Sequence, residues 1–183
     1  SSGYLAGLVE HNPALVDALI SKGGPGPEMP HHADMPAIRQ WQNEALLRIG
    51  CDDLTGEVPQ EQTFAALSEV AATVLRVLYV RAWKRTARRL GKPLARSGKA
   101  VAMACFAGGK FGGAEISYGS DLDLFFVYGS EGQTRRRVPN KVFFSELVQE
   151  VTRAMHGLYK VDARLRPDGR SAPLALSLGG YRS

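Results

Sequence analysis

The stretch 108-GGKFGGAEISYGSDLDLFFVY-128 decides the expected fold, because a glycine-rich segment precedes two aspartates that lead into an apolar run. The run is continuous and of strand length, which is typical of a strand buried in a sheet. Successive side chains alternate along a strand, so Asp121 and Asp123 are expected on one face, about 6.6 Å apart, while Leu122 and Leu124 point into the core. The stretch therefore predicts a buried strand with two carboxylates at its start.

Two other segments predict strands beside it. VAMACFA at 101–107 is a continuous apolar run and is expected to form a second central strand. LYKVDARLRP at 158–167 alternates between apolar and charged residues, which predicts a third strand that ends at the proline. One face of that strand is expected to carry Lys160, Asp162, Arg164 and Arg166. If it lies beside the strand with the two aspartates, Asp162 joins their face.

Three carboxylates within a few ångströms raise one another's pKa and favour protonation, unless a cation offsets their charge. Hard oxygen ligands suit Mg²⁺ or Mn²⁺, and Mg²⁺ usually takes further ligands from a bound phosphate chain. Carboxylates that hold two such ions stabilise both oxygens of an in-line phosphoryl displacement. Asp121, Asp123 and Asp162 are therefore the predicted metal-binding and catalytic residues.

The glycine-rich segment supplies the expected phosphate contacts. Gly108 and Gly109 lack Cβ atoms, so the backbone can approach a phosphate with its N–H groups, and Lys110 adds a positive charge. Arg164 and Arg166, on the face of the third aspartate, are expected to contact phosphate or to restrain that aspartate.

Other known binding motifs with similar residues match this sequence poorly. Two acids separated by one residue at a strand start also occur where they only cap a turn, so the glycine loop and VDARLRP carry much of the argument. Phe125 and Phe126 occupy positions where a calcium-binding EF-hand loop needs oxygen ligands and glycine. The lysine of GGKFGG is misplaced for a Walker A loop, and Ala107 stands where a dinucleotide fingerprint needs glycine.

The remaining periodicity predicts helices. A first helix over 12–23 is expected to start at Asn12, and a linker rich in proline and glycine follows to residue 32. Asp34 is expected to cap a second helix whose inner face carries Ile38, Trp41, Ala45 and Ile49.

The longest helix is expected from Pro59 to about Gly91, and another after Asn140 as its N-cap. The buried stripe of the longest helix is predicted to consist of Phe64, Leu67, Ala71, Val74, Leu75, Leu78 and Ala82. The inner face of the helix after Asn140 is predicted to consist of Phe144, Leu147, Val148, Val151 and Met155.

The formal net charge of +5 is concentrated in two clusters, at 81–92 and 134–141. The first falls in the last turns of the longest helix, where cations complement the helix dipole, so it needs no ligand. The second falls between a strand and a helix, where a solvated loop is the favoured interpretation. The alternative is that it guides an anionic partner or product.

Cys51 and Cys105 have no metal-ligand spacing, and Cys105 lies in an apolar run, so a buried thiol and a reducing cytoplasm are expected. Apolar stretches break before the roughly 18 residues that a membrane span needs, and the sequence lacks a secretory signal pattern. Neither membrane insertion nor secretion is therefore expected. The sequence starts without methionine and stops just after an apolar stretch, and is expected to be a piece of a longer protein.

The quoted stretch, together with 159-YKVDARLRPDGRSAPLALS-177, resembles the repeated nucleotidyltransferase domain of the bifunctional glutamine synthetase adenylyltransferase/adenylyl-removing enzymes. That family belongs to the polymerase β-like superfamily, and the resemblance spans about 101–178. It implies an α+β fold with a small mixed sheet, in which 98–183 form a C-terminally truncated catalytic core and 1–97 a helical segment before it.

The resemblance implies that Asp121, Asp123 and Asp162 bind the metal and that Gly108, Gly109, Lys110 and Ser120 line the triphosphate. Two departures from the family pattern stand at Ala107, where glycine is usual, and Ala114, where arginine is usual.

The implied activity is transfer of AMP from ATP to a tyrosine of glutamine synthetase, or its removal by phosphorolysis, in the control of nitrogen assimilation. The implied partners are glutamine synthetase and, through parts outside this chain, the PII signal protein. No nucleic acid or membrane partner is expected. The alternative is a domain of the same fold that binds nucleotide or protein without turnover, and the direction of reaction stays open.

Overall fold

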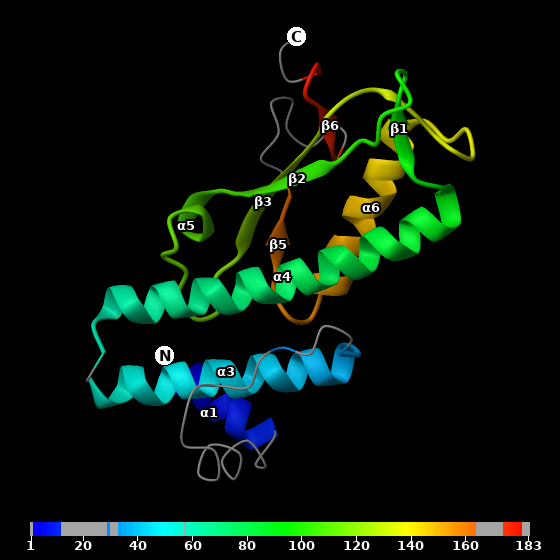
Figure 1. Ribbon diagram of the computed structural model, residues 1–183. Helices are drawn as coiled ribbons and strands as arrows, with labels where there is room; N and C mark the ends of the chain where they lie inside the picture. The colour runs from blue at the N-terminus through cyan, green and yellow to red at the C-terminus, as the bar shows by residue number, and fades with distance from the viewer. Residues whose placement is uncertain (1, 12–28, 30–32, 57, 164–173, 181–183) are drawn as a thin grey trace. The chain divides into compact units, whose positions relative to one another are not determined.

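The computed structural model describes residues 2–11, 29, 33–56, 58–163 and 174–180 (Figure 1). The helices are α1 Ser2–His11, α3 Met35–Thr55, α4 Gln60–Leu90, α5 Gly109–Gly112 and α6 Asn140–Met155. The strands are β1 Pro93–Ala95, β2 Met103–Ala107, β3 Leu122–Tyr128, β4 Gly132–Thr134, β5 Val161–Asp162 and β6 Leu176–Ser177. The predicted helix over 12–23 and most of the linker after it lie outside the described residues.

The chain divides into two compact units, and each is described by itself. The first unit comprises 1–74 and 114–120, and the second comprises 75–113 and 121–183. The division falls within α4 and does not follow the predicted boundary between 97 and 98, which stays a prediction about domains. The mixture of helices with a small mixed sheet confirms the α+β class.

In the first unit, Asp34 caps α3 as predicted, because its carboxylate accepts a hydrogen bond of 2.9 Å from the N–H of Ala37. The helix ends at Gly56, whose φ of 71° is left-handed. The predicted inner face of α3 is only partly right. Its buried residues are Ile38, Gln42, Glu44, Leu46, Leu47 and Gly50.

The physical reason for this shifted face is α1, a helix that the sequence analysis did not predict. Leu5 of α1 forms an apolar cluster with Leu47 of α3. Gly50 completes the contact, because a Cβ there would overlap the Leu5 side chain. Trp41 and Ile49, expected inside, are therefore only half-buried.

The longest helix, α4, begins and ends as the sequence predicts. Five of the seven predicted stripe residues are buried: Leu67, Ala71, Val74, Leu78 and Ala82. Phe64 and Leu75 are half-buried. Among the described helices, α4 alone has the length and apolar composition to cross a membrane, a criterion that the core helix of a soluble protein also meets.

The second unit is built on β3, which pairs antiparallel with β2 and parallel with β5 and β6 (Figure 1). Burial alternates strictly along β3, with one face buried and Asp123, Phe125 and Val127 half-buried on the other. The prediction that β2 is a central strand is wrong for the described sheet, where β2 pairs only with β3. The outer face of β2 carries Phe106, which is 46% exposed and stacks on Phe125.

The helix α6 supplies the core beneath the buried face of β3. The predicted inner face is confirmed, since Phe144, Leu147, Val148, Val151 and Met155 are all buried, and Phe143 joins them. The rings of Phe144 and Tyr128 stack with their centroids 4.5 Å apart.

Asn140 is not the N-cap of α6, which corrects the prediction. Pro139 takes that position, and Asn140 is the first helical residue. Its fully buried side-chain amide donates instead to the carbonyl oxygens of Leu94 at 3.0 Å and Ser130 at 3.1 Å. Asn140 therefore ties the start of α6 to strand β1 and to the loop between β3 and β4.

The first basic cluster has the structural role that the sequence predicts. Arg88 and Arg89 lie in the last turn of α4. Arg89 donates to Glu146 of α6 at 2.5 Å, and Arg85 lies 3.8 Å from Glu150. Such exposed pairs each contribute about 0–1 kcal/mol.

A second, two-stranded sheet pairs β1 with β4 and carries two turns of the same design. In the turn after β1, Ala95 and Lys99 are joined by a backbone hydrogen bond of 2.8 Å, and Gly98 has a φ of 81°. In the turn after β4, Thr134 and Val138 are joined at 2.8 Å, and Arg137 has a φ of 61°. Three-residue hairpin loops place such a left-handed residue last, where glycine is the usual choice.

We expect Arg137→Gly to raise the free energy of unfolding by about 1 kcal/mol, because a side chain in the left-handed region costs energy that glycine avoids. Urea denaturation measures this change. Arg135→Gly is the control, and it should lower stability by about 0.5–1 kcal/mol, since it only adds freedom to the unfolded chain. Equal effects of the two changes would contradict the assigned turn geometry.

The two cysteines lie in different environments. Cys105 pairs with Phe126 across the strands β2 and β3 on their core-facing side, and burial raises the pKa of its thiol to about 12. Cys51 is exposed on α3, and both cysteines are free. Cys105 is half-buried, so the expectation of a buried thiol is only partly right.

We expect Cys51 to react with a thiol reagent at pH 8 at least about 100-fold faster than Cys105, since only the thiolate is nucleophilic and its fraction falls as the pKa rises. The time course of reagent release measures both rates. Cys51→Ser should remove the fast phase and leave the slow one. A fast phase that survives in this variant would show that Cys105 is accessible.

Candidate functional site

The predicted aspartates meet where β3 and β5 begin to pair. The parallel register sets Asp123 opposite Asp162 and Leu122 opposite Val161. Paired residues of neighbouring strands project from the same face, so Asp162 lies on the face of Asp123 and not on the core side. The backbone N–H of Leu122 donates to the carbonyl of Lys160 at 2.8 Å and fixes this register. The register therefore puts two of the three predicted acids, Asp123 and Asp162, side by side on one face.

Asp121 has a cationic neighbour that the sequence analysis did not single out. Its carboxylate accepts a hydrogen bond of 2.7 Å from the ammonium group of Lys160. Lys160 is two residues before Asp162 and so projects from the same strand face, a spacing that could have revealed the pair. The two side chains are 44% and 80% exposed, so the ion pair contributes about 0–1 kcal/mol and can be exchanged for other partners.

The side chains as they stand do not form a closed ligand set. Within the described residues, no group of three or more histidine, cysteine, aspartate or glutamate side chains is arranged to hold a metal ion. Asp121 is turned to Lys160, while the backbone pairing joins Asp123 to Asp162. The role of the three aspartates as metal ligands therefore stays a prediction.

The predicted glycine loop folds directly over Asp123. The N–H of Gly108 donates to the carbonyl of Asp123 at 2.9 Å, and the short helix α5 follows at once. Gly109 has a φ of 50°, and any Cβ there would overlap the carboxylate of Asp123. Only glycine lets the backbone lie this close to the aspartate. Lys110 is exposed in the same turn.

The roles of the other predicted residues stay predictions. Ser120 directly precedes Asp121 in the chain, and its hydroxyl accepts a hydrogen bond of 3.0 Å from the N–H of Ser117. Arg164 and Arg166 lie outside the described residues. Of the two departures from the family pattern, Ala107 ends β2, and Ala114 has a left-handed φ of 55°.

One further feature shares the face of Asp123. Phe125 follows two residues later on β3, and its ring stacks on that of Phe106 with centroids 4.9 Å apart and planes 12° apart. The sequence analysis assigned the apolar run to the core and so did not expect this pair on the more open face. It gives the site a flat aromatic border beside the carboxylates.

Paired acids on one face of a mixed sheet, with a glycine loop over one of them, are the features from which the sequence predicted a nucleotidyltransferase site. Comparison with known proteins agrees with this class. Residues 26–183 match the family model described as glutamate-ammonia ligase adenylyltransferase. The chain therefore belongs to the glutamate-ammonia ligase adenylyltransferase family.

Several similar proteins are bifunctional glutamine synthetase adenylyltransferase/adenylyl-removing enzymes. The protein of Haemophilus ducreyi is 34% identical over 166 residues, which cover 85% of this chain and 17% of that protein. The protein of Shewanella frigidimarina is 36% identical over 158 residues, covering 81% and 17%. The protein of Pasteurella multocida is 28% identical over 214 residues, covering 100% and 22%. The chain thus spans roughly a fifth or less of these relatives.

We expect Gly109→Ala to cost at least about 1 kcal/mol more in free energy of unfolding than Gly98→Ala. Both glycines have a positive φ, so the backbone strain is matched, but only at Gly109 would the new Cβ overlap a neighbour, while Gly98 has open space. Urea denaturation of both variants measures the difference. Equal costs would show that the loop does not lie against Asp123.

Proposed function

We propose that this chain is a metal-dependent nucleotidyltransferase domain that acts on a tyrosine of glutamine synthetase. It either transfers AMP from ATP to the tyrosine or removes AMP by phosphorolysis. The observation that carries the proposal is the parallel register of β3 and β5, which sets Asp162 beside Asp123 on one face. The names of the similar proteins support the reaction and its target.

The residues present fit Mg²⁺ or Mn²⁺. The donors on the shared face are carboxylate oxygens, which hard divalent cations prefer. Asp121, Asp123 and Asp162 would hold the ion, and Asp121 would exchange its exposed Lys160 partner for it. When bound, the ion would offset charge on the phosphate chain and on the displaced oxygen.

The chain's own groups then position the substrate. Gly108 and Gly109 let the backbone approach the triphosphate, and Lys110 and Lys160 supply positive charge beside it. For transfer, the tyrosine oxygen attacks the α-phosphorus of ATP, pyrophosphate leaves, and the phenolic proton is released. For removal, an oxygen of inorganic phosphate attacks the adenylyl phosphorus, the bond to the tyrosine oxygen breaks so that ADP is formed, and the displaced tyrosine oxygen takes up a proton. Both reactions place the same atoms over the same carboxylates.

The broader setting is part of the same proposal. The domain works in the cytoplasm as part of a longer, multifunctional enzyme that controls nitrogen assimilation. It acts on glutamine synthetase, responds to the PII protein through other parts of that enzyme, and needs no nucleic acid or membrane. The alternative is a domain that binds nucleotide or a protein partner without turnover.

We expect Asp121→Asn and Asp123→Asn each to reduce product formation at least about 100-fold, because each removes a charge from the predicted metal site. The products are adenylylated glutamine synthetase from ATP, or ADP from the adenylylated protein and phosphate. Both are measured with added Mg²⁺ or Mn²⁺, and Mg²⁺-dependent ATP binding is measured in parallel.

Asp52→Asn is the matched control, since Asp52 is an exposed acid on α3 in the other unit. It should leave both products and ATP binding unchanged. ATP binding without either product would favour the alternative of a silent binding domain. Full activity in Asp123→Asn would overturn the site.

A further inference from the structure

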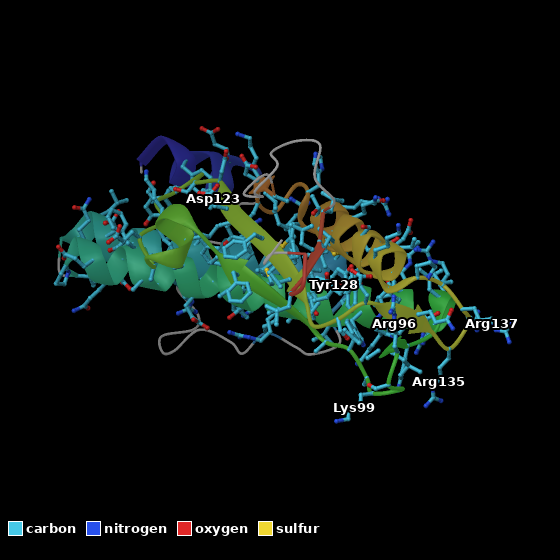
Figure 2. The ribbon with its side chains drawn as sticks, turned by 90° about the horizontal axis from the view of Figure 1, so that it is seen from above. Arg96, Lys99, Asp123, Tyr128, Arg135 and Arg137 are labelled. Atoms are coloured by element: carbon cyan, nitrogen blue, oxygen red, sulfur yellow. The ribbon has the colours of Figure 1, made fainter. Side chains whose placement is uncertain are left out.

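The second unit has another charged region, beyond the Tyr128 end of β3. Figure 2 shows Asp123 well apart from Arg96, Arg135 and Arg137. The two hairpin turns and the first residues of α6 enclose an open hollow of about 960 Å³. Its cationic lining residues are Arg96, Arg135, Arg137 and Lys141. The proposed nucleotidyltransferase reaction uses none of them.

The positive charge of this hollow is not compensated within the described residues. Arg96, Arg135, Arg137 and Lys141 are exposed, and none of them takes part in an ion pair with a described acid. Arginines on the neighbouring helices differ, since Arg85, Arg89 and Arg153 all pair with glutamates.

The acid that lines the hollow is already engaged. Glu131 accepts a hydrogen bond of 2.6 Å from the hydroxyl of Tyr128 at the end of β3. Burial, together with this carboxylate, raises the pKa of the Tyr128 phenol, so the donor keeps its proton. Glu131 is thereby directed to Tyr128, and the guanidinium groups stay available to an external anion.

The backbone at Arg137 is held in an unfavourable conformation. Its φ of 61° is left-handed, whereas the matching turn after β1 uses Gly98 at the same place. A glycine would relieve the strain, so the arginine carries a stability cost. Strain kept at one residue of an otherwise regular turn is typical of positions that serve binding.

The frame beneath these side chains is rigid. Thr134 is 2% exposed, and its hydroxyl oxygen accepts from the N–H groups of Arg136 and Val138, each at 3.2 Å. The Asn140 amide donates to Leu94 of β1 and to Ser130 in the loop before β4. The cations therefore stand on a prearranged scaffold, which reduces the entropy lost when a ligand binds.

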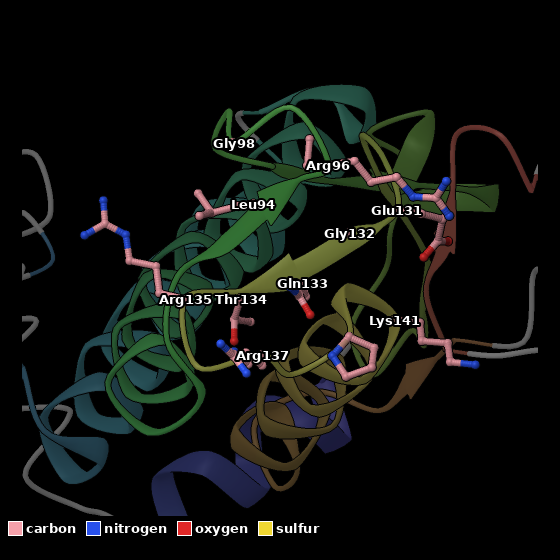
Figure 3. Close-up of a pocket in the computed structure, with 12 residues that line it drawn as sticks. Leu94, Arg96, Gly98, Glu131, Gly132, Gln133, Thr134, Arg135, Arg137 and Lys141 are labelled. Carbon is pink, nitrogen blue, oxygen red and sulfur yellow. The ribbon is translucent and has the colours of Figure 1, made fainter.

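We propose that this hollow binds an acidic segment of a protein partner through several carboxylates. The cations come from three separate places around the hollow, namely the turn after β1, the turn after β4 and the start of α6, and they do not converge on one point (Figure 3). This spacing suits an extended chain with repeated acids better than a single phosphate. The exposed amide of Gln133, between them, suits a peptide backbone.

Nucleic acid is the less favoured occupant. Single-stranded nucleic acids are held by aromatic side chains that stack on the bases as well as by cations. None of the described residues that line the hollow is aromatic. Complementary charge on protein surfaces mainly sets partner choice and association rate, which fits an exposed rim of this kind.

The test uses a fluorescent oligoglutamate peptide and measures anisotropy at low salt with the whole protein. The hollow variant combines Arg135→Ala with Lys141→Ala. The matched control combines Lys84→Ala with Arg88→Ala, which removes the same charge from exposed positions of α4. We expect the hollow variant to bind at least about tenfold more weakly than the parent, and the control to stay within about twofold.

Arg137→Gly gives a second, independent measurement. We expect it to weaken peptide binding while raising the free energy of unfolding, a combination that loss of folding cannot produce. Asp123→Asn should bind the peptide as the parent does. The peptide-binding proposal is therefore tested independently of the proposed catalysis.

Two results would overturn the proposal. The first is equal weakening in the hollow variant and the α4 control, which would mean that net charge alone attracts the peptide. The second is tighter binding of a fluorescent oligonucleotide than of the peptide, lost in the hollow variant but not in the control, which would assign the hollow to nucleic acid.

Discussion

The parallel pairing of β3 with β5 is the constraint on which the second unit depends. Because side chains alternate along a strand, a shift of one residue would place Val161 beside Asp123 and turn Asp162 into the core. The hydrogen bond between Leu122 and Lys160 holds the observed register. Parallel neighbours also need a long crossover, which α6 provides, and its aromatic face packs under the end of β3. The helix that fills the core beneath β3 is thus also the connection that brings Asp162 beside Asp123.

The strand β3 also separates two kinds of charge. Its beginning carries Asp121 and Asp123 under the glycine loop, and the chain after its end enters the basic hairpin. Between them lies an apolar layer formed by Phe126, Phe144 and their neighbours. Asp123 and the arginines of the two hairpin turns therefore lie well apart (Figure 2). The proposed nucleotide site and the proposed acidic-peptide site therefore lie beyond different ends of β3.

Much of this unit could be predicted from local patterns. The continuous apolar run LDLFFVY predicted β3, alternation along a strand predicted the shared face of the two aspartates, and the spacing of apolar residues predicted α4 and α6. Patterns failed where the deciding contact is distant in sequence. The local sequence predicts Asn140 as the N-cap of α6, but its side-chain amide donates to the carbonyl oxygens of Leu94 and Ser130 instead. Two glycines weaken the helical signal of α1, and the apolar run of β2 reads the same for a central strand and for an edge.

About as much of the candidate site as of the fold could be predicted from the sequence. Spacing placed the acids and the glycines, and the register agrees with it. The ion pair between Asp121 and Lys160 was missed because Lys160 was placed on the strand face but given no partner. The aromatic border of Phe106 and Phe125 was missed because apolar residues were assigned to the interior. Metal binding and direction of reaction depend on groups that a strand pattern does not encode.

The crossover through α6 has a consequence for the newly made chain. As the polypeptide leaves the ribosome, β2 and β3 are available to each other early, whereas the segment that supplies the third acid emerges only after the whole of α6. Contacts between segments far apart in sequence form late, because closing the chain over them costs more entropy. A growing chain therefore exposes Asp121 and Asp123 before the segment that carries Asp162 can pair with β3.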